Sequence, residues 1–104
     1  MTNKITSILT TLVILSGFWV NLELTAYTHT GQRTASGRWP VAGRTVATND
    51  YPLGTKITIW NHTYTVEDRM HPSITNTVDI FVDTYNQAIN FGRKKEVQCY
   101  IELP

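Results

Sequence analysis

Two patterns of hydrophobic and polar residues divide the chain. Residues 5–20 carry no charge and are mostly apolar, with residues 12–15 as a continuous aliphatic run. From Asn21 onward, short stretches of alternating apolar and polar residues follow one another, separated by Pro, Gly and Asn. Alternation with a period of two is typical of strands that bury one face. The pattern therefore predicts an apolar N-terminal segment followed by an all-β domain.

The alternating stretches predict six short strands. They cover residues 22–27, 44–48, 56–60, 63–67, 78–82 and 96–102. We expect a tight hairpin at Asn61-His62 between the third and fourth strands. Asp83-Thr84 resembles a helix N-cap, which predicts a short helix over residues 85–91 that ends at Gly92. Strands this short leave unpaired edges unless the sheet closes, so the sequence favours a small barrel over an open sheet.

The N-terminal segment, residues 1–20, has the pattern of a signal peptide. Lys4 supplies a basic start, and the apolar region that follows is shorter than the ~20 residues needed to cross a bilayer. Ser16-Gly17 offers small residues for cleavage, but Leu15 lies where a second small residue is expected. An uncleaved membrane anchor and a buried apolar helix are therefore alternatives. Signal peptide and anchor both predict a domain of residues 22–104 in the cell envelope, either exported or facing outward from the cytoplasmic membrane.

Composition narrows the classes of partner. The chain has 104 residues, 41% of them hydrophobic, which suits one globular domain that we expect to be monomeric. Nine Lys/Arg against eight Asp/Glu give a net charge of +1, so no basic field points to nucleic acid. His29, His62 and His71 lack ligand spacing, so we predict no metal site and no cofactor. The single Cys99 lies in a predicted strand and is interpreted as a packed thiol.

Two acids stand out as candidates for chemistry. Asp68 ends one predicted strand, Asp79 lies near the start of the next, and a polar loop joins them. Carboxylates that face each other across a cleft suit acid/base catalysis, because partial burial and proximity raise the pKa of one of them. The simpler alternative is that both acids cap turns and accept hydrogen bonds from nearby backbone N–H groups.

Several short motifs occur together in one order along residues 22–102. They are Leu24-Thr25-Ala26-Tyr27-Thr28, Thr34-Ala35-Ser36-Gly37, Val46-Ala47, Pro52-Leu53-Gly54-Thr55, Val66-Glu67-Asp68, Val78-Asp79-Ile80-Phe81 and Gln87-Ala88-Ile89-Asn90-Phe91-Gly92-Arg93. This ordered set resembles the 3D (Asp-Asp-Asp) domain of MltA-type lytic transglycosylases and stationary-phase survival proteins. It is also similar to the related rare lipoprotein A barrels. The resemblance implies a six-stranded double-psi β-barrel.

The resemblance also implies a reaction and its residues. Members of the family cleave the β-1,4 bond between N-acetylmuramic acid and N-acetylglucosamine in peptidoglycan without water. Asp79 matches the catalytic acid, Asp68 the supporting acid, and Asp50 is the best match for the third Asp. The family has a glycine-rich loop after the first acid, whereas residues 69–76 contain no glycine.

Three aromatic residues and one arginine are candidates for substrate contacts. Tyr27, Trp39 and Tyr51 could stack on sugar faces, or could simply pack in the core or at the rim. Arg69 follows Asp68 directly and is a further candidate for binding substrate. The expected partner is the peptidoglycan glycan strand, and the membrane only if the N-terminal segment is retained. The alternatives are a barrel that binds glycan without cutting it and a lysis-accessory protein, from a phage for example.

Overall fold

The structure is a computed structural model that describes residues 17–104. The predicted signal peptide or anchor lies outside these residues, apart from its last four positions. Within the described part of the chain, no helix has the length and apolar character that crossing a membrane requires.

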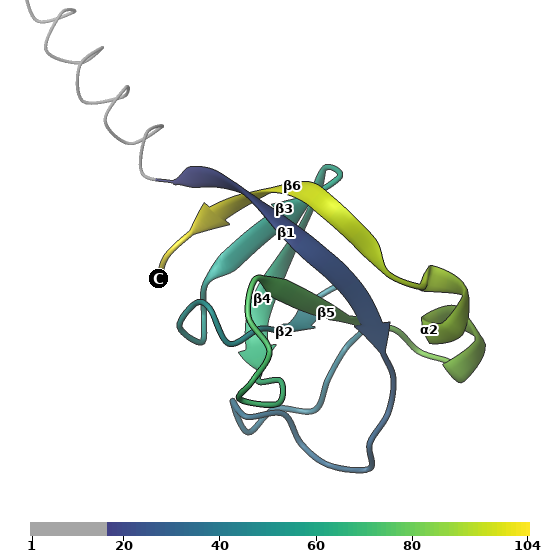
Figure 1. Ribbon diagram of the computed structural model, residues 1–104. Coiled ribbons are helices and arrows are strands. Elements are labelled where there is room, and N and C mark those ends of the chain that lie inside the picture. Colours follow the sequence, from purple (N-terminus) through teal and green to yellow (C-terminus); the bar gives the residue numbers. More distant parts are fainter. Residues whose placement is uncertain (1–16) are drawn as a thin grey trace, which may run out of the picture.

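The described chain forms one closed barrel of six strands with a short helix beside it (Figure 1). The elements are β1 (Phe18–Tyr27), β2 (Thr45–Ala47), β3 (Lys56–Ile59), β4 (His62–Asp68), β5 (Thr77–Phe81), α2 (Tyr85–Phe91) and β6 (Lys94–Glu102). Around the barrel the strands follow the order β1-β5-β2-β4-β3-β6. The β1–β5 and β2–β4 pairs are parallel and the other pairs are antiparallel. The predicted mainly-β barrel with one short helix is confirmed.

Each predicted strand differs from the observed one by one to four residues at one end or both, and two of these differences change the pairing or the turn. β1 begins at Phe18 and not at residue 22, because Phe18 pairs with Ile101 and extends the long β1–β6 ladder. The hairpin between β3 and β4 turns at Trp60-Asn61, one residue earlier than predicted. Both residues have positive φ, 48° and 66°, which is the backbone of the two-residue turn that matches strand twist.

The helix forms where its caps predict it. The Thr84 side chain accepts a hydrogen bond from the backbone N–H of Gln87, and the Gln87 side chain accepts one from the backbone N–H of Thr84. This capping box satisfies two of the donors that a helix start leaves free. Gly92 ends the helix with a φ of 69°, a conformation that glycine adopts without strain.

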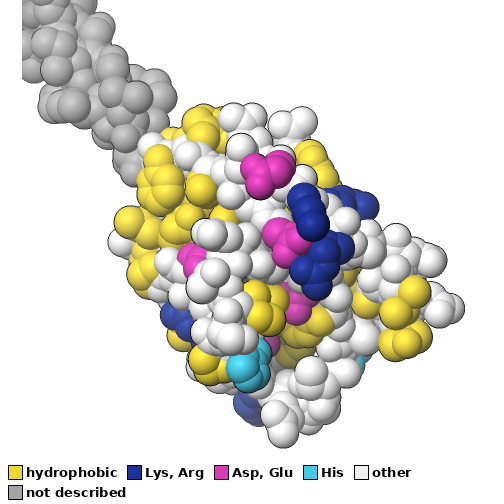
Figure 2. Space-filling view, viewed as in Figure 1, with side chains coloured by type: hydrophobic (Ala, Val, Ile, Leu, Met, Phe, Trp, Pro, Cys, Tyr) yellow, Lys and Arg dark blue, Asp and Glu magenta, His cyan; other side chains and the backbone are white. Residues whose placement is uncertain are grey.

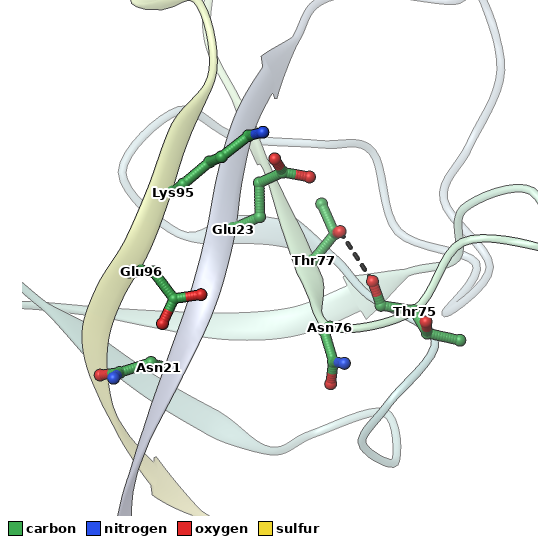
Figure 3. A pocket seen from close by; sticks show the side chains of 7 residues that line it. All are labelled: Asn21, Glu23, Thr75, Asn76, Thr77, Lys95 and Glu96. Atoms are coloured by element: carbon green, nitrogen blue, oxygen red, sulfur yellow. Dashed lines mark hydrogen bonds between the residues drawn. The ribbon is translucent and has the colours of Figure 1, made fainter.

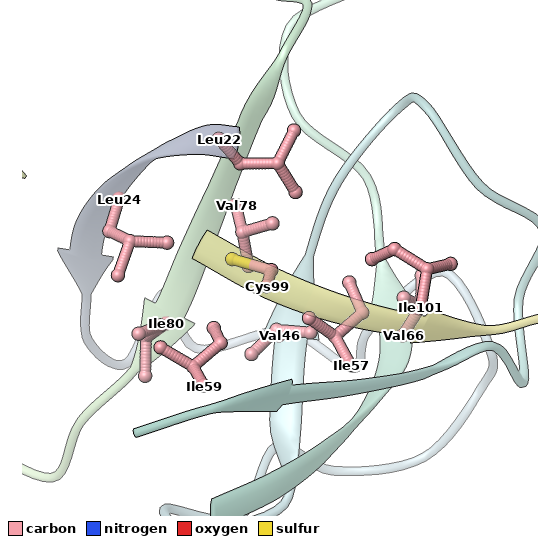
Figure 4. Packing of buried hydrophobic residues seen from close by; sticks show 10 residues of the cluster. All are labelled: Leu22, Leu24, Val46, Ile57, Ile59, Val66, Val78, Ile80, Cys99 and Ile101. Carbon is pink, nitrogen blue, oxygen red and sulfur yellow. The ribbon is translucent and has the colours of Figure 1, made fainter. Parts of the chain in front are cut away.

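The hydrophobic core lies inside the barrel, and along each strand every second side chain points into it (Figure 4). Its buried members are Leu22, Leu24, Val46, Ile57, Ile59, Val66, Val78, Ile80, Cys99 and Ile101. Cys99 is fully buried there, and this burial raises the pKa of its thiol to about 11. It is therefore a packed thiol, as the sequence predicts, and the raised pKa keeps it protonated at neutral pH. Because these residues point inward, the alternate residues of β1 and β5 face outward.

Candidate functional site

Parallel pairing of β1 with β5 assembles a row of polar and aromatic side chains on the outer face of the barrel. The register places Glu23 beside Thr77 and Thr25 beside Asp79. Thr25 Oγ1 donates a hydrogen bond of 2.8 Å to Asp79 Oδ1. One row further along, the rings of Tyr27 and Phe81 meet edge to face with centroids 5.5 Å apart. Asp79 therefore lies between a polar row and an aromatic row.

The second acid, Asp68 of β4, is separated from Asp79 of β5 by one intervening strand, β2. Ala47 of β2 pairs with Asp68 on one side and with Asp79 on the other. Two strand spacings put about 10 Å between the backbones of the two acids. The fold thus brings together the two acids that the sequence singled out.

Asp68 is fixed by three hydrogen bonds. Its Oδ1 accepts from the backbone N–H groups of Ala35, at 3.0 Å, and Arg69, at 2.9 Å. Its Oδ2 accepts from the hydroxyl of Tyr27 at 3.0 Å. Donors reach both oxygens, an environment that suits a carboxylate acting only as an acceptor. The turn-capping alternative therefore describes part of what Asp68 does, since one of these donors is the next residue.

Asp79 and Tyr27 both have perturbed pKa values. Burial raises the pKa of Asp79, the hydrogen bond from Thr25 lowers it in part, and the negative charge of Asp68 raises it again. Burial also raises the pKa of the Tyr27 hydroxyl far above its usual range, and the neighbouring Asp68 carboxylate adds to this effect. Tyr27 therefore stays protonated and keeps donating to Asp68, while Asp79 holds its proton at higher pH than a free aspartic acid does.

Beside Asp79 lies a polar groove. A cavity of about 520 Å³ is lined by Glu23, Thr25, Ala26, Met70, Ser73, Ile74, Thr75, Thr77, Asp79 and Arg93. A second cavity of about 370 Å³ adjoins it and is lined by Asn21, Glu23, Thr75, Asn76, Thr77, Lys95 and Glu96 (Figure 3). They share Glu23, Thr75 and Thr77, so we treat them as one feature, the β1–β5 groove. Figure 2 shows acidic and basic side chains side by side on the face over β1 and β6.

The third candidate acid, Asp50, lies apart from the other two. It occupies the turn after β2, where its backbone N–H donates to Thr48 Oγ1 at 3.3 Å. Its Oδ2 is buried without a hydrogen-bond partner among the described residues. None of the hydrogen bonds within residues 17–104 joins Asp50 to Asp68 or Asp79.

None of the aromatic residues predicted to bind substrate, Tyr27, Trp39 and Tyr51, lines the groove. Trp39 is 53% exposed and carries the Arg33 guanidinium over its ring at 5.1 Å. Tyr51 packs against the ring of Phe18, with centroids 6.1 Å apart. Tyr27 is occupied by its hydrogen bond to Asp68. In the described chain, no aromatic side chain lines either cavity of the groove.

Arg69 points away from the acid that precedes it. Its guanidinium donates to the carbonyl oxygens of Thr48, at 2.7 Å, and Tyr51, at 2.6 Å. Only its backbone N–H contacts Asp68. The side chain therefore ties the loop after β4 to the turn after β2 and forms no ion pair with Asp68.

Sequence reasoning missed two residues that shape the site. Thr25 donates to Asp79. The alternation of residues along the strand could have placed it outside the barrel, because its neighbour Leu24 is a core residue. Glu67 is buried, and accepts hydrogen bonds from Arg44 Nε at 2.8 Å and Thr45 Oγ1 at 2.7 Å. Because Arg44 comes from the loop between β1 and β2, Glu67 holds that loop against β4.

Chemically, the arrangement offers a carboxyl with a raised pKa and a second carboxyl fixed by hydrogen bonds, beside a polar groove. Within residues 17–104, no group of three or more His, Cys, Asp or Glu side chains is placed to hold a metal ion. Asp79 is thus the titratable group best placed to transfer a proton at this site. No protein-family model, no curated protein and no solved structure matches the chain significantly.

Proposed function

We propose that this protein is a lytic transglycosylase that cleaves the bond between N-acetylmuramic acid and N-acetylglucosamine, with Asp79 as general acid and base. The observation that carries the proposal is the environment of Asp79: a carboxyl with a raised pKa at a polar groove, one strand from the fixed acid Asp68. The resemblance of the motifs to the 3D domain supports it, and under this proposal the barrel has the double-psi topology. The apolar N-terminal segment that precedes β1 directs the domain to the cell envelope.

In this mechanism Asp79 acts twice. Its protonated carboxyl first gives its proton to the glycosidic oxygen, and the bond from that oxygen to the anomeric carbon breaks. Positive charge then develops on the sugar ring, where the Asp68 carboxylate stabilises it. Finally the 6-hydroxyl of the same sugar bonds to the anomeric carbon and returns its proton to Asp79. The product is an anhydro sugar, so the reaction consumes neither water nor a cofactor.

Digestion of purified peptidoglycan by the purified protein tests this function. We expect the soluble products to end in anhydro-muramic acid, because an internal hydroxyl replaces water as the attacking group. Separation of the muropeptides followed by mass spectrometry distinguishes these products from reducing ends. Reducing ends alone would make the protein a hydrolase and would refute the non-hydrolytic step.

A glycan-binding barrel without activity is the second candidate, and a lysis-accessory role belongs with it. It is favoured by the loop between Asp68 and Asp79, where no glycine lets a sugar approach the backbone closely. In this case both acids serve as hydrogen-bond acceptors for sugar hydroxyls. The same digestion separates the candidates, because a binding barrel leaves the sacculi intact and sediments with them.

Thr25→Val tests whether Asp79 is the titrating acid. The hydrogen bond from Thr25 lowers the pKa of Asp79, so its removal raises that pKa further. Since catalysis begins with protonated Asp79, we expect the alkaline limb of the pH–rate profile to move to higher pH. Thr63→Val is the matched control, because it also removes a side-chain hydroxyl hydrogen bond, the one of 2.8 Å to the Thr58 hydroxyl on an exposed surface. A limb that stays in place, or moves to lower pH, would show that another group controls the rate.

A further inference from the structure

The β1–β5 groove carries charges of both signs and no aromatic platform. Glu23 and Glu96 supply carboxylates, Arg93 and Lys95 supply cations, and the remaining lining side chains are mostly hydroxyl and amide groups. Sugar subsites usually present aromatic faces, whereas charged pairs recognise charged ligands. The lining therefore suits a ligand that has both carboxylate and ammonium groups better than a neutral glycan.

A bulge in β6 directs two neighbouring charges into this groove. The register pairs Leu22 with Val97 and Leu24 with Lys94, so Lys95 and Glu96 together oppose the single residue Glu23. Glu96 has a φ of 55°, an uncommon conformation for a residue other than glycine. Successive strand residues normally face opposite sides, but here both line the same cavity (Figure 3). Bulges re-aim side chains in this way beside functional sites.

The two charged residues of the bulge, Lys95 and Glu96, form no ion pair with another described residue. Glu23 pairs with Arg93 at 2.8 Å, on a surface where the Arg93 side chain is 62% exposed. The groove thus has a free cation and a free anion at the end remote from Asp79.

The length of the groove matches a short extended peptide. On β1 its lining runs from Asn21 to Ala26, which is about 17 Å of strand. Five extended peptide residues span about the same distance. We propose that the groove binds the peptide stem of peptidoglycan, and that the protein therefore prefers peptide-bearing strands to peptide-free glycan. This inference rests on the proposed function, because it takes Asp79 as the point where the sugar lies.

The chemistry of the substrate fits this path. The peptide stem is attached to the same muramic acid ring whose glycosidic bond is cleaved, so a ring at Asp79 would start its peptide at that end of the groove. Stem carboxylates would meet Arg93 and Lys95, and the ammonium group of a diamino acid would meet Glu96. A glycan without peptides leaves Lys95 and Glu96 without ion-pair partners among the described residues.

Binding of free stem peptide to the full-length chain tests the groove without requiring catalysis. The probe is the peptide released from sacculi by an amidase, titrated into the parent and into a Lys95→Gln/Glu96→Gln variant. The variant loses the two exposed charge pairs that Lys95 and Glu96 would form with the peptide, so we expect it to bind about five- to tenfold more weakly. Added salt should weaken binding to the parent, because it screens these charges. The matched control is Lys56→Gln/Glu102→Gln, two charged residues at neighbouring register positions of β3 and β6 that lie outside the groove. It should bind like the parent.

Cleavage of two substrates separates this inference from the proposed function. We expect the parent to cleave peptide-bearing strands faster than amidase-stripped glycan, and the variant to lose this preference. Equal cleavage of both substrates by the parent, or equal peptide binding by parent and variant, would overturn the inference while leaving the transglycosylase standing. If the parent binds the peptide but cleaves neither substrate, the proposed activity falls and the peptide site is supported.

Discussion

Asp79→Asn is expected to lower the release of anhydro products by about 10²–10⁴-fold, the usual contribution of a general acid or base. Asparagine keeps the shape of the side chain and can still accept the hydrogen bond from Thr25, but it has no proton to give. The carboxyl that it replaces has the raised pKa and the position beside the groove that proton transfer requires. Binding of glycan should be largely kept, since the groove retains its other contacts.

The same substitution should raise the thermal stability of the protein at neutral pH. Because the pKa of Asp79 is raised in the folded state, its contribution to stability is fully present below the usual Asp pKa. That contribution is lost as the pH rises through the folded pKa. At pH 7, well above the usual Asp pKa, the unfolded parent gains a freely hydrated charge that the partly buried site in the folded state disfavours. Asparagine avoids this cost, so its advantage in melting temperature should shrink as the pH falls toward 3.

Thermal melts at pH 3 to 7, together with product analysis, check both expectations on one variant. Glu102→Gln is the control, because Glu102 is exposed near the C-terminus and lies outside the groove. An Asp79→Asn protein that is folded at the assay temperature and still cleaves at the parent rate would place the chemistry elsewhere. A variant less stable than the parent at pH 7 would contradict the sign of the pKa shift.

The sequence predicts those features of the fold that depend on local pattern. Alternation along β1 and β5 is enough to place Leu24 and Val78 inside the barrel and Thr25 and Asp79 outside it. The cap at Thr84 is a local hydrogen-bond pattern, so the helix was also predictable. The hairpin was misplaced by one residue because Trp60 adopts a positive φ, which its residue type gives no reason to expect.

The contacts that define the site depend on pairings between distant segments. Thr25 and Asp79 are 54 residues apart, and their hydrogen bond exists only because β1 and β5 pair in parallel. The side chain of Arg69 contacts backbone carbonyls 18 and 21 residues earlier in the chain. Its direction therefore could not be predicted from the neighbouring residue Asp68. The groove requires a bulge in β6, and no residue in that strand has a type that predicts a bulge. The sequence pattern therefore identified the two acids, but not the hydrogen bonds and the groove that surround them.

Glu67→Gln is expected to lower the free energy of unfolding at pH 7 by about 2–3 kcal/mol. Breaking a buried ion pair typically costs about 3–5 kcal/mol, and the lower figure allows for the exposure of both arginines. The Glu67 carboxylate is 3% exposed and contacts Arg44 at 2.8 Å and Arg38 at 3.1 Å, whose side chains are 32% and 59% exposed. Glutamine keeps the size of the side chain but loses the charge that both arginines face.

The effect should depend on pH in the opposite sense to that of Asp79. Burial raises the pKa of Glu67, but hydrogen bonds from Arg44 and Thr45 and the charges of Arg44 and Arg38 outweigh it, so the pKa is lowered overall. Its stabilising contribution is therefore present above the usual Glu pKa and is lost as the pH falls through the lowered value. Parent and variant should differ most in melting temperature near neutral pH and converge in acid.

Glu67→Gln should also slow cleavage more than its loss of stability explains. The loop that Arg38 and Arg44 anchor to Glu67 includes Ala35, whose N–H donates to the supporting acid Asp68. A loosened loop would leave Asp68 with fewer donors and a less defined position, so turnover should fall even at temperatures where the variant is fully folded. Glu23→Gln is the control for stability, because it removes an exposed ion pair worth at most about 1 kcal/mol. Denaturant melts and product release, measured side by side, would contradict this account if Glu67→Gln lost no more stability than Glu23→Gln.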